Sequence, residues 1–255
     1  MPVLLIVSVL LQFFCLVHMV RTGRPHWWLW VIVIGSYLGV AVYIFTQVLP
    51  ELGNDPTSRR LVRNVRDRID PERQRRHIAQ QLDIADTVEN RRRLAEESLR
   101  LGDHANAAEL YQSVLKGIYA TDPAFLLGLA KSQAGMHQYA AARDTLDTLI
   151  AANPQFRSDD GHFLYARCLE ELGEHQRALE EYEVLASSYP GEEPRLRYGL
   201  LLQQLQRPAD ARRVFEDMLK RARAAPKYYR RKEQAFLDAA QKALNAQGGG
   251  GVSNE

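Results

Sequence analysis

The feature that most constrains this chain of 255 residues is a recurring pair of small residues twelve positions apart. The four pairs are Ala95 and Ala107, Ala130 and Ala142, Ala166 and Ala178, and Gly199 and Ala211. Two antiparallel helices approach closely only where small residues face each other, and large residues then fill the volume beside that contact. A bulky side chain follows each second small residue by four positions: Tyr111, Leu146, Tyr182 and Phe215. The pattern therefore predicts four helical hairpins that share one packing scheme.

The composition agrees with a helical protein. Leucine, alanine, glutamate and arginine dominate, and no run of alternating β-branched residues predicts a strand. The net charge is nearly balanced, with 33 Lys and Arg against 31 Asp and Glu. We therefore expect an all-α chain.

The four first-position small residues recur at intervals of 35, 36 and 33 residues. The chain thus resembles the tetratricopeptide family, whose repeat is about 34 residues long, over residues 88–225. Gly102-Asp103 and Gly173-Glu174 suit the turn inside a repeat, and Pro154 and Pro190 suit repeat ends. The resemblance implies an α-solenoid of about four repeats. The second and fourth copies lack a turn glycine in register, and we interpret this as loop variation.

In this family the first helix of each repeat lines a groove that accepts a protein or peptide ligand. The resemblance therefore implies eight groove-facing candidates, two in each copy: Arg92, Glu96, Leu127, Lys131, Phe163, Arg167, Leu196 and Leu200. These side chains mix apolar and basic character. Our hypothesis is that the groove binds a segment with apolar anchors and acidic residues.

A solenoid needs covered ends, because a terminal repeat would otherwise expose its apolar inner face. Residues 226–247 predict a C-terminal capping helix with an apolar stripe. Residues 248–255 predict a disordered tail. Residues 72–87 predict a further helix before the first repeat.

The N-terminal segment, residues 1–50, predicts a transmembrane hairpin. Residues 2–20 and 27–48 carry no charged side chain when His18 is neutral, and each is long enough to cross a bilayer as a helix. Trp27, Trp28 and Trp30 suit an interfacial aromatic belt. A cleaved signal peptide is the alternative for residues 1–20, although no basic n-region precedes it.

The hairpin also resembles the N-terminal two-helix segment of bacterial cardiolipin synthases of the phospholipase D type. The likeness consists of tryptophan entering the second span, then Tyr37-Leu38-Gly39 and Tyr43. The HxK motif of those enzymes is absent, because no histidine here has lysine two residues on. The resemblance implies anchoring in a bacterial inner (plasma) membrane, without the catalytic part.

Residues 51–87 predict a basic juxtamembrane linker. Between Thr57 and Ala79 there are eight arginines and three acids, a balance of 8 − 3 = +5. Since Lys and Arg concentrate on the cytoplasmic side, we expect the repeats in the cytoplasm. The candidates for contact with anionic lipid are Arg59, Arg60, Arg63 and Arg66. A topology signal in a solvated linker is the interpretation that we favour over lipid contact, and nucleic acid is a minor alternative because no aromatic residues are interleaved.

The sequence predicts no enzyme. It contains no GxSxG, HExxH, Walker or G-x-G-x-x-G motif, and neither cofactor nor metal is expected. Adjacent acids such as Glu170 and Glu171 suggest solvated helix faces, and Cys15 and Cys168 suggest buried apolar side chains. We therefore expect a membrane-anchored scaffold or adaptor. The alternative is an accessory subunit of a lipid-metabolism or envelope-biogenesis complex, recruited through the hairpin; the partner and the oligomeric state are not predicted.

Overall fold

The computed structural model describes residues 2–21, 42, 46 and 70–249. The chain divides into two compact units, Met1–Arg73 and Gln74–Glu255, which are taken in turn. Throughout the described residues the regular elements are helices and no strand occurs, so the all-α prediction is confirmed there.

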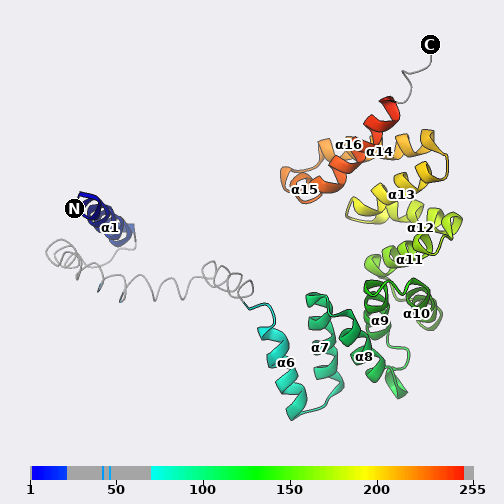
Figure 1. Cartoon of the computed structure of the whole chain (residues 1–255), viewed down its shortest axis with the longest axis horizontal. Helices are drawn as coiled ribbons and strands as arrows, with labels where there is room; N and C mark the ends of the chain where they lie inside the picture. The colour runs from blue at the N-terminus through cyan, green and yellow to red at the C-terminus, as the bar shows by residue number, and fades with distance from the viewer. Residues whose placement is uncertain (1, 22–41, 43–45, 47–69, 250–255) are drawn as a thin grey trace. The chain divides into compact units, whose positions relative to one another are not determined.

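The first unit contains α1, which covers Pro2–Arg21 (Figure 1). Within the described part of the chain, no helix combines the length and the apolar character needed to cross a membrane. The predicted second span, 27–48, lies outside the described residues except for Val42 and Thr46. The predicted lipid-facing residues Arg59, Arg60, Arg63 and Arg66 also lie outside them.

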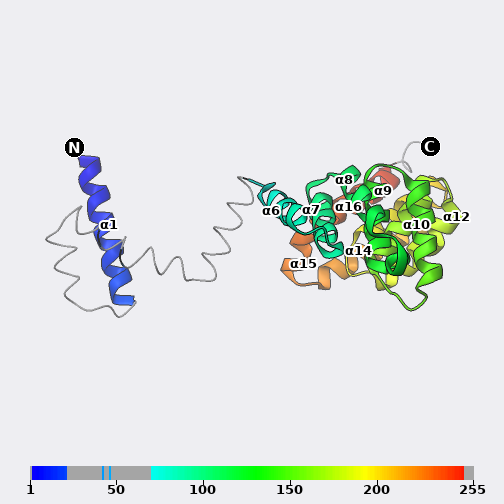
Figure 2. The same cartoon turned by 90° about the horizontal axis from the view of Figure 1, so that it is seen from below.

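The second unit contains the predicted hairpins. Within residues 70–249, eight helices pair in chain order into four antiparallel hairpins, α7 with α8, α9 with α10, α11 with α12, and α13 with α14. Figure 1 shows these hairpins following one another in an arc, and Figure 2 shows the same stack from below. Their bounds are α7 Val88–Leu101, α8 His104–Val114, α9 Pro123–Gly135, α10 Tyr139–Ala152, α11 Asp159–Glu171, α12 His175–Ser188, α13 Glu193–Gln204 and α14 Pro208–Ala224.

The small residues form the close contacts that their spacing predicts. All seven alanines of the four pairs are 0% exposed, and Gly199 is buried. A Cβ atom on Gly199 would lie 2.3 Å from Cε1 of Phe215, whose ring is itself 0% exposed. The large residue thus occupies the space that the missing side chain leaves, and the predicted packing scheme is confirmed.

The turn inside each repeat has the same left-handed backbone in all four described copies. The residue in this conformation is Gly102 (φ 81°), His137 (φ 60°), Gly173 (φ 76°) and Gln206 (φ 58°). Glycine adopts positive φ without steric penalty, whereas other residues are strained there. The departures noted in the sequence therefore change the residue at the turn and leave its conformation unchanged.

The first repeat is followed by an insertion. A short 3₁₀ helix, η2, covers Gly117–Tyr119 before α9 begins. Asp122 caps α9 through its side chain, which accepts from the backbone N–H of Ala124 and Phe125 at 2.9 and 3.1 Å. The chain therefore re-enters the repeat register at Pro123.

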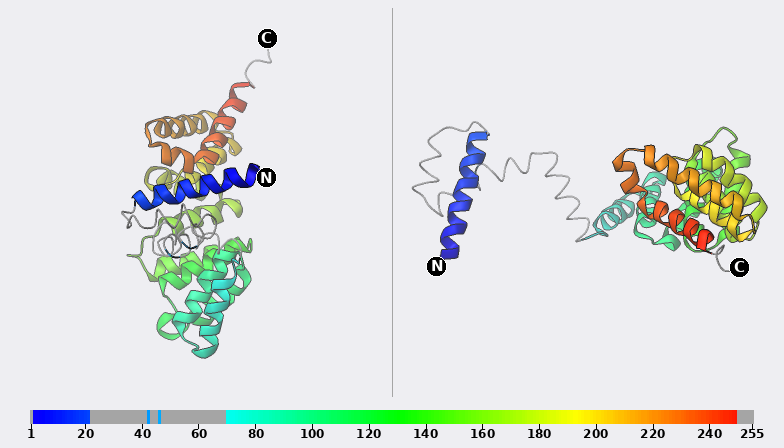
Figure 3. Two further views of the ribbon diagram at one scale, coloured as in Figure 1. Left: turned by 90° about the vertical axis from the view of Figure 1, so that its left-hand side faces the viewer. Right: turned by 90° about the horizontal axis from the view of Figure 1, so that it is seen from above.

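Additional helices lie at both ends of the stack. At the first end α6, Arg73–Ile84, buries Ile78, and its Gln81 accepts a hydrogen bond from Arg93 of α7 at 2.9 Å. At the other end α16, Gln234–Gly249, packs against α14 and α13 (Figure 3). Its Ala240 is 0% exposed. The helix α16 thus covers the face that the last repeat would otherwise expose, and α6 contacts the first repeat through the Gln81–Arg93 hydrogen bond.

The predicted single capping helix over 226–247 is wrong in one respect. The structure has two helices, α15 over Lys227–Lys232 and α16, with a break at Glu233. Glu233 is 4% exposed, and its Oε2 accepts the backbone N–H of Glu192 at 3.0 Å. The chain turns here because that carboxylate reaches back to the start of α13.

Candidate partner-binding site

The eight predicted groove residues lie in pairs on the first helices of the repeats. Members of a pair are four residues apart, so they share one helix face. Their surroundings differ between copies, and each copy presents a different chemistry on this face. The pairs are Arg92 and Glu96 on α7, Leu127 and Lys131 on α9, Phe163 and Arg167 on α11, and Leu196 and Leu200 on α13.

In the first copy the basic charge is balanced within its own helix. Arg92 Nη2 lies 2.8 Å from Oε1 of Glu89, and its Nη1 donates to Glu96. The hydrogen bond with Glu89 is the main reason that the pKa of Arg92 is raised, and it outweighs desolvation. This copy therefore offers one arginine that is already paired with two carboxylates, Glu89 and Glu96.

In the second copy the basic residue joins two repeats. Lys131 Nζ lies 3.2 Å from Oδ2 of Asp160 at the start of α11, and the other oxygen of Asp160 lies 3.4 Å from the hydroxyl of Tyr189. Leu127 is half-buried and packs close to Gly161, where an added Cβ would lie 3.2 Å from its Cδ1. Lys131 is thus exposed but already paired.

In the third copy the aromatic residue belongs to the core. Phe163 is 8% exposed, and its ring centroid lies 5.5 Å from that of Tyr189 and 6.4 Å from that of Tyr182. The guanidinium carbon of Arg167 lies over the Phe163 ring, 5.9 Å from its centroid, at a distance that suits a cation–π contact.

Arg167 differs from the other basic residues of this face in its lack of an ion pair. Among the described residues it has no carboxylate partner, and its Nε is buried with no hydrogen-bond acceptor. Lys131, at the equivalent position one repeat earlier, pairs with Asp160. Arg167 therefore has hydrogen-bonding capacity that the described structure leaves unused.

The fourth copy contributes apolar surface. Leu196 is 8% exposed and belongs to the core, whereas Leu200 is 43% exposed. Of the four predicted apolar candidates, Leu200 is therefore the most exposed. Phe163 and Leu196 expose only a small part of their side chains to a ligand.

The sequence reasoning missed a polar network beside this face. Glu170 accepts a hydrogen bond from the Tyr182 hydroxyl at 2.5 Å and another from Nη1 of Arg197 at 3.2 Å. Burial is the main cause of the raised pKa of Tyr182, and the nearby Glu170 carboxylate adds to it. The expectation that Glu170 lies on a solvated face is wrong. The two residues that bond to Glu170 are Tyr182 and Arg197, and both lie on other helices. Spacing along a single helix could therefore not reveal the contact.

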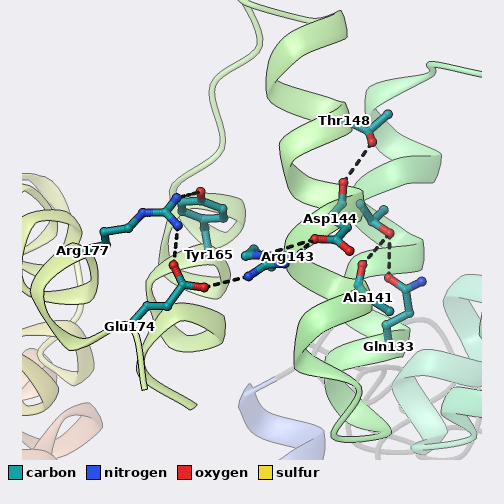
Figure 4. Close-up of polar contacts among 9 residues, drawn as sticks. Gln133, Ala141, Arg143, Asp144, Thr148, Tyr165, Glu174 and Arg177 are labelled. Carbon is teal, nitrogen blue, oxygen red and sulfur yellow. Dashed lines mark hydrogen bonds and ion pairs between the residues drawn. The ribbon is translucent and has the colours of Figure 1, made fainter. Parts of the chain in front are cut away.

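A second polar network ties the middle repeats together at the turn end (Figure 4). Glu174, in the turn of the third repeat, accepts from Arg143 of α10 at 2.7 Å and from Arg177 of α12. Arg177 Nη2 also donates to the Tyr165 hydroxyl at 2.8 Å. This cluster connects α10, α11 and α12, so it joins the second repeat to the third.

The described residues offer no evident place for a metal. No group of three or more His, Cys, Asp or Glu side chains that could hold an ion occurs among them. Both cysteines are buried and unpaired in this part of the chain, and burial raises the pKa of the Cys168 thiol to about 11. Such a thiol remains protonated and unreactive near neutral pH.

Comparisons with known proteins agree with the repeat geometry. Residues 127–193 match the family model described as a tetratricopeptide repeat. MamA from Desulfovibrio magneticus RS-1 is similar in structure with a TM-score of 0.56 and 15% identity, over 66% of this chain and 95% of that one. A thermophilic tetratricopeptide repeat protein of Thermus thermophilus has a TM-score of 0.50 and 16% identity, over 66% and 87%.

One sequence match is of another kind. A methyltransferase of Gibberella zeae is 35% identical over 86 residues, which make up 34% of this chain and 12% of that protein. The match therefore spans a small part of the relative. The chain thus matches a tetratricopeptide repeat by sequence over residues 127–193, and its repeat unit shares the fold of the structural neighbours.

Proposed function

We propose that the repeat unit is a protein-interaction scaffold that binds an acidic segment of a partner across the first helices α9, α11 and α13. The observation that carries this is Arg167, whose guanidinium lies over Phe163 and pairs with no carboxylate of the described residues. A carboxylate of a partner would bind the terminal nitrogens of this guanidinium, since Nε is buried, and a charge-assisted hydrogen bond of this kind is stronger than a neutral one.

Leu200 and Lys131 complete the proposed surface. Leu200 is 43% exposed at the position of α13 that corresponds to Arg167 on α11. Lys131 holds the same position on α9, and its side chain is 39% exposed although it pairs with Asp160. A partner segment with an apolar side chain next to an acidic one matches these three positions.

The test is to cross-link the full chain to its bound partners, to purify the complexes, and to quantify the captured proteins by mass spectrometry. Arg167→Glu combined with Leu200→Glu is expected to reduce the main captured protein at least about tenfold, which corresponds to about 1.4 kcal/mol. Arg213→Glu is the matched control, because Arg213 lies on α14 with its side chain 80% exposed. Equal capture by the double variant and the wild type would contradict the proposal.

The N-terminal segment is proposed to hold this scaffold at a bacterial inner membrane, with the repeats in the cytoplasm. The support comes from the sequence, in which residues 2–20 and 27–48 carry no charged side chain and an arginine-rich stretch follows. Protease accessibility of the C-terminus in right-side-out spheroplasts would contradict the cytoplasmic orientation. Extraction of the full chain from membranes by carbonate would contradict integral anchoring.

The alternative is an accessory subunit that is recruited to a membrane enzyme through the N-terminal segment. Replacing residues 1–50 by an unrelated anchor separates the two hypotheses. A scaffold is expected to keep its function after the exchange, whereas an accessory subunit recruited through the segment is expected to lose it.

The proposal includes no catalysis. It rests on the lack of the common catalytic motifs in the full sequence. The similarity to a methyltransferase, which covers 12% of that protein, gives this chain no methyl-transfer role on its own. Saturable binding of S-adenosylmethionine by the purified chain would contradict this part of the proposal.

A further inference from the structure

The middle repeats contain a cavity that is lined by one predicted groove residue, Leu127 of α9, and by residues of the second helices α10 and α12. It has a volume of about 340 Å³ and lies between α9, α10, α11, α12 and the loop that precedes α11. A cavity of this size is within the range of specific binding sites. Its apolar wall is formed by Leu127, Leu146, Leu149, Ile150, Phe156 and Tyr165.

The apolar surface continues outside the cavity. Ile150 lines it and is 53% exposed, and Val184, one helical turn after Glu181 on α12, is 54% exposed. Exposed apolar side chains beside a cavity enlarge the area that an occupant can cover. A small ligand would fill the cavity and leave these two side chains in water, so the surface suits a protein segment better.

The mouth of the cavity is acidic. Glu181 and Asp159 both line it, and neither forms an ion pair with a lysine or arginine of the described residues. Glu181 Oε2 is 2.6 Å from Nε2 of His162, which leaves its other oxygen available. Arg157 lines the same mouth, but its Nη1 donates to the backbone carbonyls of Pro154 and Phe156 at 2.9 and 3.3 Å.

The equivalent cavity one repeat later lacks this charge preference. It lies between α12, α13 and α14, has a volume of about 600 Å³, and its wall contains Tyr198 in place of Tyr165. Three basic side chains line it against two acidic ones, so its lining has a basic excess: Arg195, Lys220 and Arg221 against Glu183 and Asp217. Charge complementarity therefore singles out the cavity of the middle repeats.

We propose that this cavity binds a segment of a partner protein that inserts one aromatic or large aliphatic side chain and places a lysine or arginine against Glu181 and Asp159. The inserted side chain would contact Leu146, Leu149 and Tyr165, and the neighbouring residues of the segment would cover Ile150 and Val184. This site shares Leu127 with the predicted groove but does not include Lys131, Arg167 or Leu200, and its ligand has the opposite charge. The scaffold thus has two sites that select different partners.

The experiment begins with random twelve-residue peptides displayed on phage and selected on the immobilised full chain. Enriched peptides are then synthesised with a fluorescent label, and their affinity for the full chain is measured by anisotropy. We expect a group of peptides with one large apolar residue next to Lys or Arg. Their affinity is expected to fall as salt rises, because exposed charges are screened.

Two variants and two matched controls locate the binding. Ile150→Glu and Glu181→Lys change exposed or half-exposed side chains and are each expected to weaken these peptides at least about tenfold, or about 1.4 kcal/mol. Ile118→Glu, at a residue 90% exposed in the insertion, and Glu180→Lys, at the exposed neighbour of Glu181, are expected to change affinity less than about twofold. Circular dichroism verifies that each variant is folded.

The outcomes separate this site from the proposed groove. Binding that survives both cavity variants but is lost in Arg167→Glu would overturn the cavity proposal and leave the groove supported. Selection that yields acid-flanked peptides, or no peptide sensitive to the cavity variants, would overturn it as well. Loss in the cavity variants with full binding by Arg167→Glu supports the cavity independently of the groove.

Discussion

At the scale of single residues, the turn inside each repeat shows how one conformation constrains four different sequences. Gly102, His137, Gly173 and Gln206 all have positive φ, yet two of them carry a side chain. A Cβ atom added to Gly102 or Gly173 would meet no other atom within 4 Å. A substitution at either glycine therefore changes backbone strain and creates no clash. Substitutions at the turn therefore measure the energetic cost of backbone strain separately from changes in side-chain packing.

Gln206→Gly is expected to stabilise the chain by about 1 kcal/mol, because glycine relieves the left-handed strain at no steric cost. Gly173→Ala is expected to destabilise it by a similar amount. Urea unfolding followed by circular dichroism measures both. His137→Gly is a useful comparison, since it also removes the contact of Nδ1 with the Tyr139 hydroxyl at 2.9 Å and should gain less. No gain from Gln206→Gly would mean that the strain is absent.

Buried tyrosines predict an alkaline limit to stability. Burial raises the pKa of Tyr111 to about 12, and burial together with the hydrogen bond to Glu192 does the same for Tyr229. In the unfolded chain these hydroxyls titrate near the ordinary value of 10.0. The unfolded state therefore loses protons first, and the stability present below about pH 10 is lost as the pH rises towards about 12.

The measurement is the urea midpoint of the wild type and of Tyr111→Phe at several pH values across that interval. Phenylalanine cannot ionise, so the variant is expected to lose less stability between about pH 10 and 12 than the wild type. Parallel curves for the two proteins would contradict the assignment of the effect to Tyr111.

At the scale of elements, the C-terminal helices α15 and α16 are held by buried polar contacts as well as by apolar packing. Glu192, 2% exposed, accepts from the Tyr229 hydroxyl at 2.8 Å, and its backbone N–H donates to Glu233. Arg195, 7% exposed, donates to the carbonyls of Ala186 and Gly191 at 2.7 and 2.6 Å. This network connects α13 to α15 and fixes the break between α15 and α16.

Ending the chain after Ala225 is expected to lower the melting temperature and to cause self-association. The reason is that α16 packs against α14 and α13, and its removal exposes the apolar surface that it covers there. Size-exclusion chromatography with light scattering measures the association. Ending the chain after Gly249 is the control and is expected to leave both properties unchanged. A monomeric, equally stable protein after the longer deletion would show that α16 is not a cap.

At the scale of the whole repeat unit, stability depends on contacts between neighbouring repeats. Glu170 of α11 bonds to Tyr182 of α12 and to Arg197 of α13, so one carboxylate joins the third repeat to the fourth. The arrangement makes Glu170 a measure of how strongly these repeats are coupled.

Glu170→Gln is expected to destabilise the chain by about 1.5 to 3 kcal/mol, the range for hydrogen bonds to charged groups. Glu171→Gln is the matched control, because its side chain is exposed and is expected to change stability by less than about 0.5 kcal/mol. Urea unfolding gives both values. A broader transition in Glu170→Gln alone would show that the third and fourth repeats unfold separately, whereas equal effects of the two variants would contradict the coupling.

The repeat architecture was predictable because its determinant is local in sequence. Small residues twelve apart and a bulky residue four further on define a helical hairpin, and Ala130 with Ala142 and Leu146 shows this directly. The surface was less predictable, because exposure depends on neighbours that come from other repeats or loops. Phe163 has the register of a groove residue, yet Tyr189, from the loop after α12, helps to bury it. The acidic cavity at Glu181 is lined by four helices and a loop, whose relative placement single-helix patterns do not give.

The covered ends of the stack restrict how a protein of this kind can change its length. A repeat added beyond α16 would find no exposed apolar face on which to stack, because α16 already occupies that side of α13 and α14. Lengthening therefore requires duplication of an internal hairpin, such as α9 with α10, which carries matching faces on both sides. Relatives of different length are expected to share these two terminal segments and to differ in the number of copies between them.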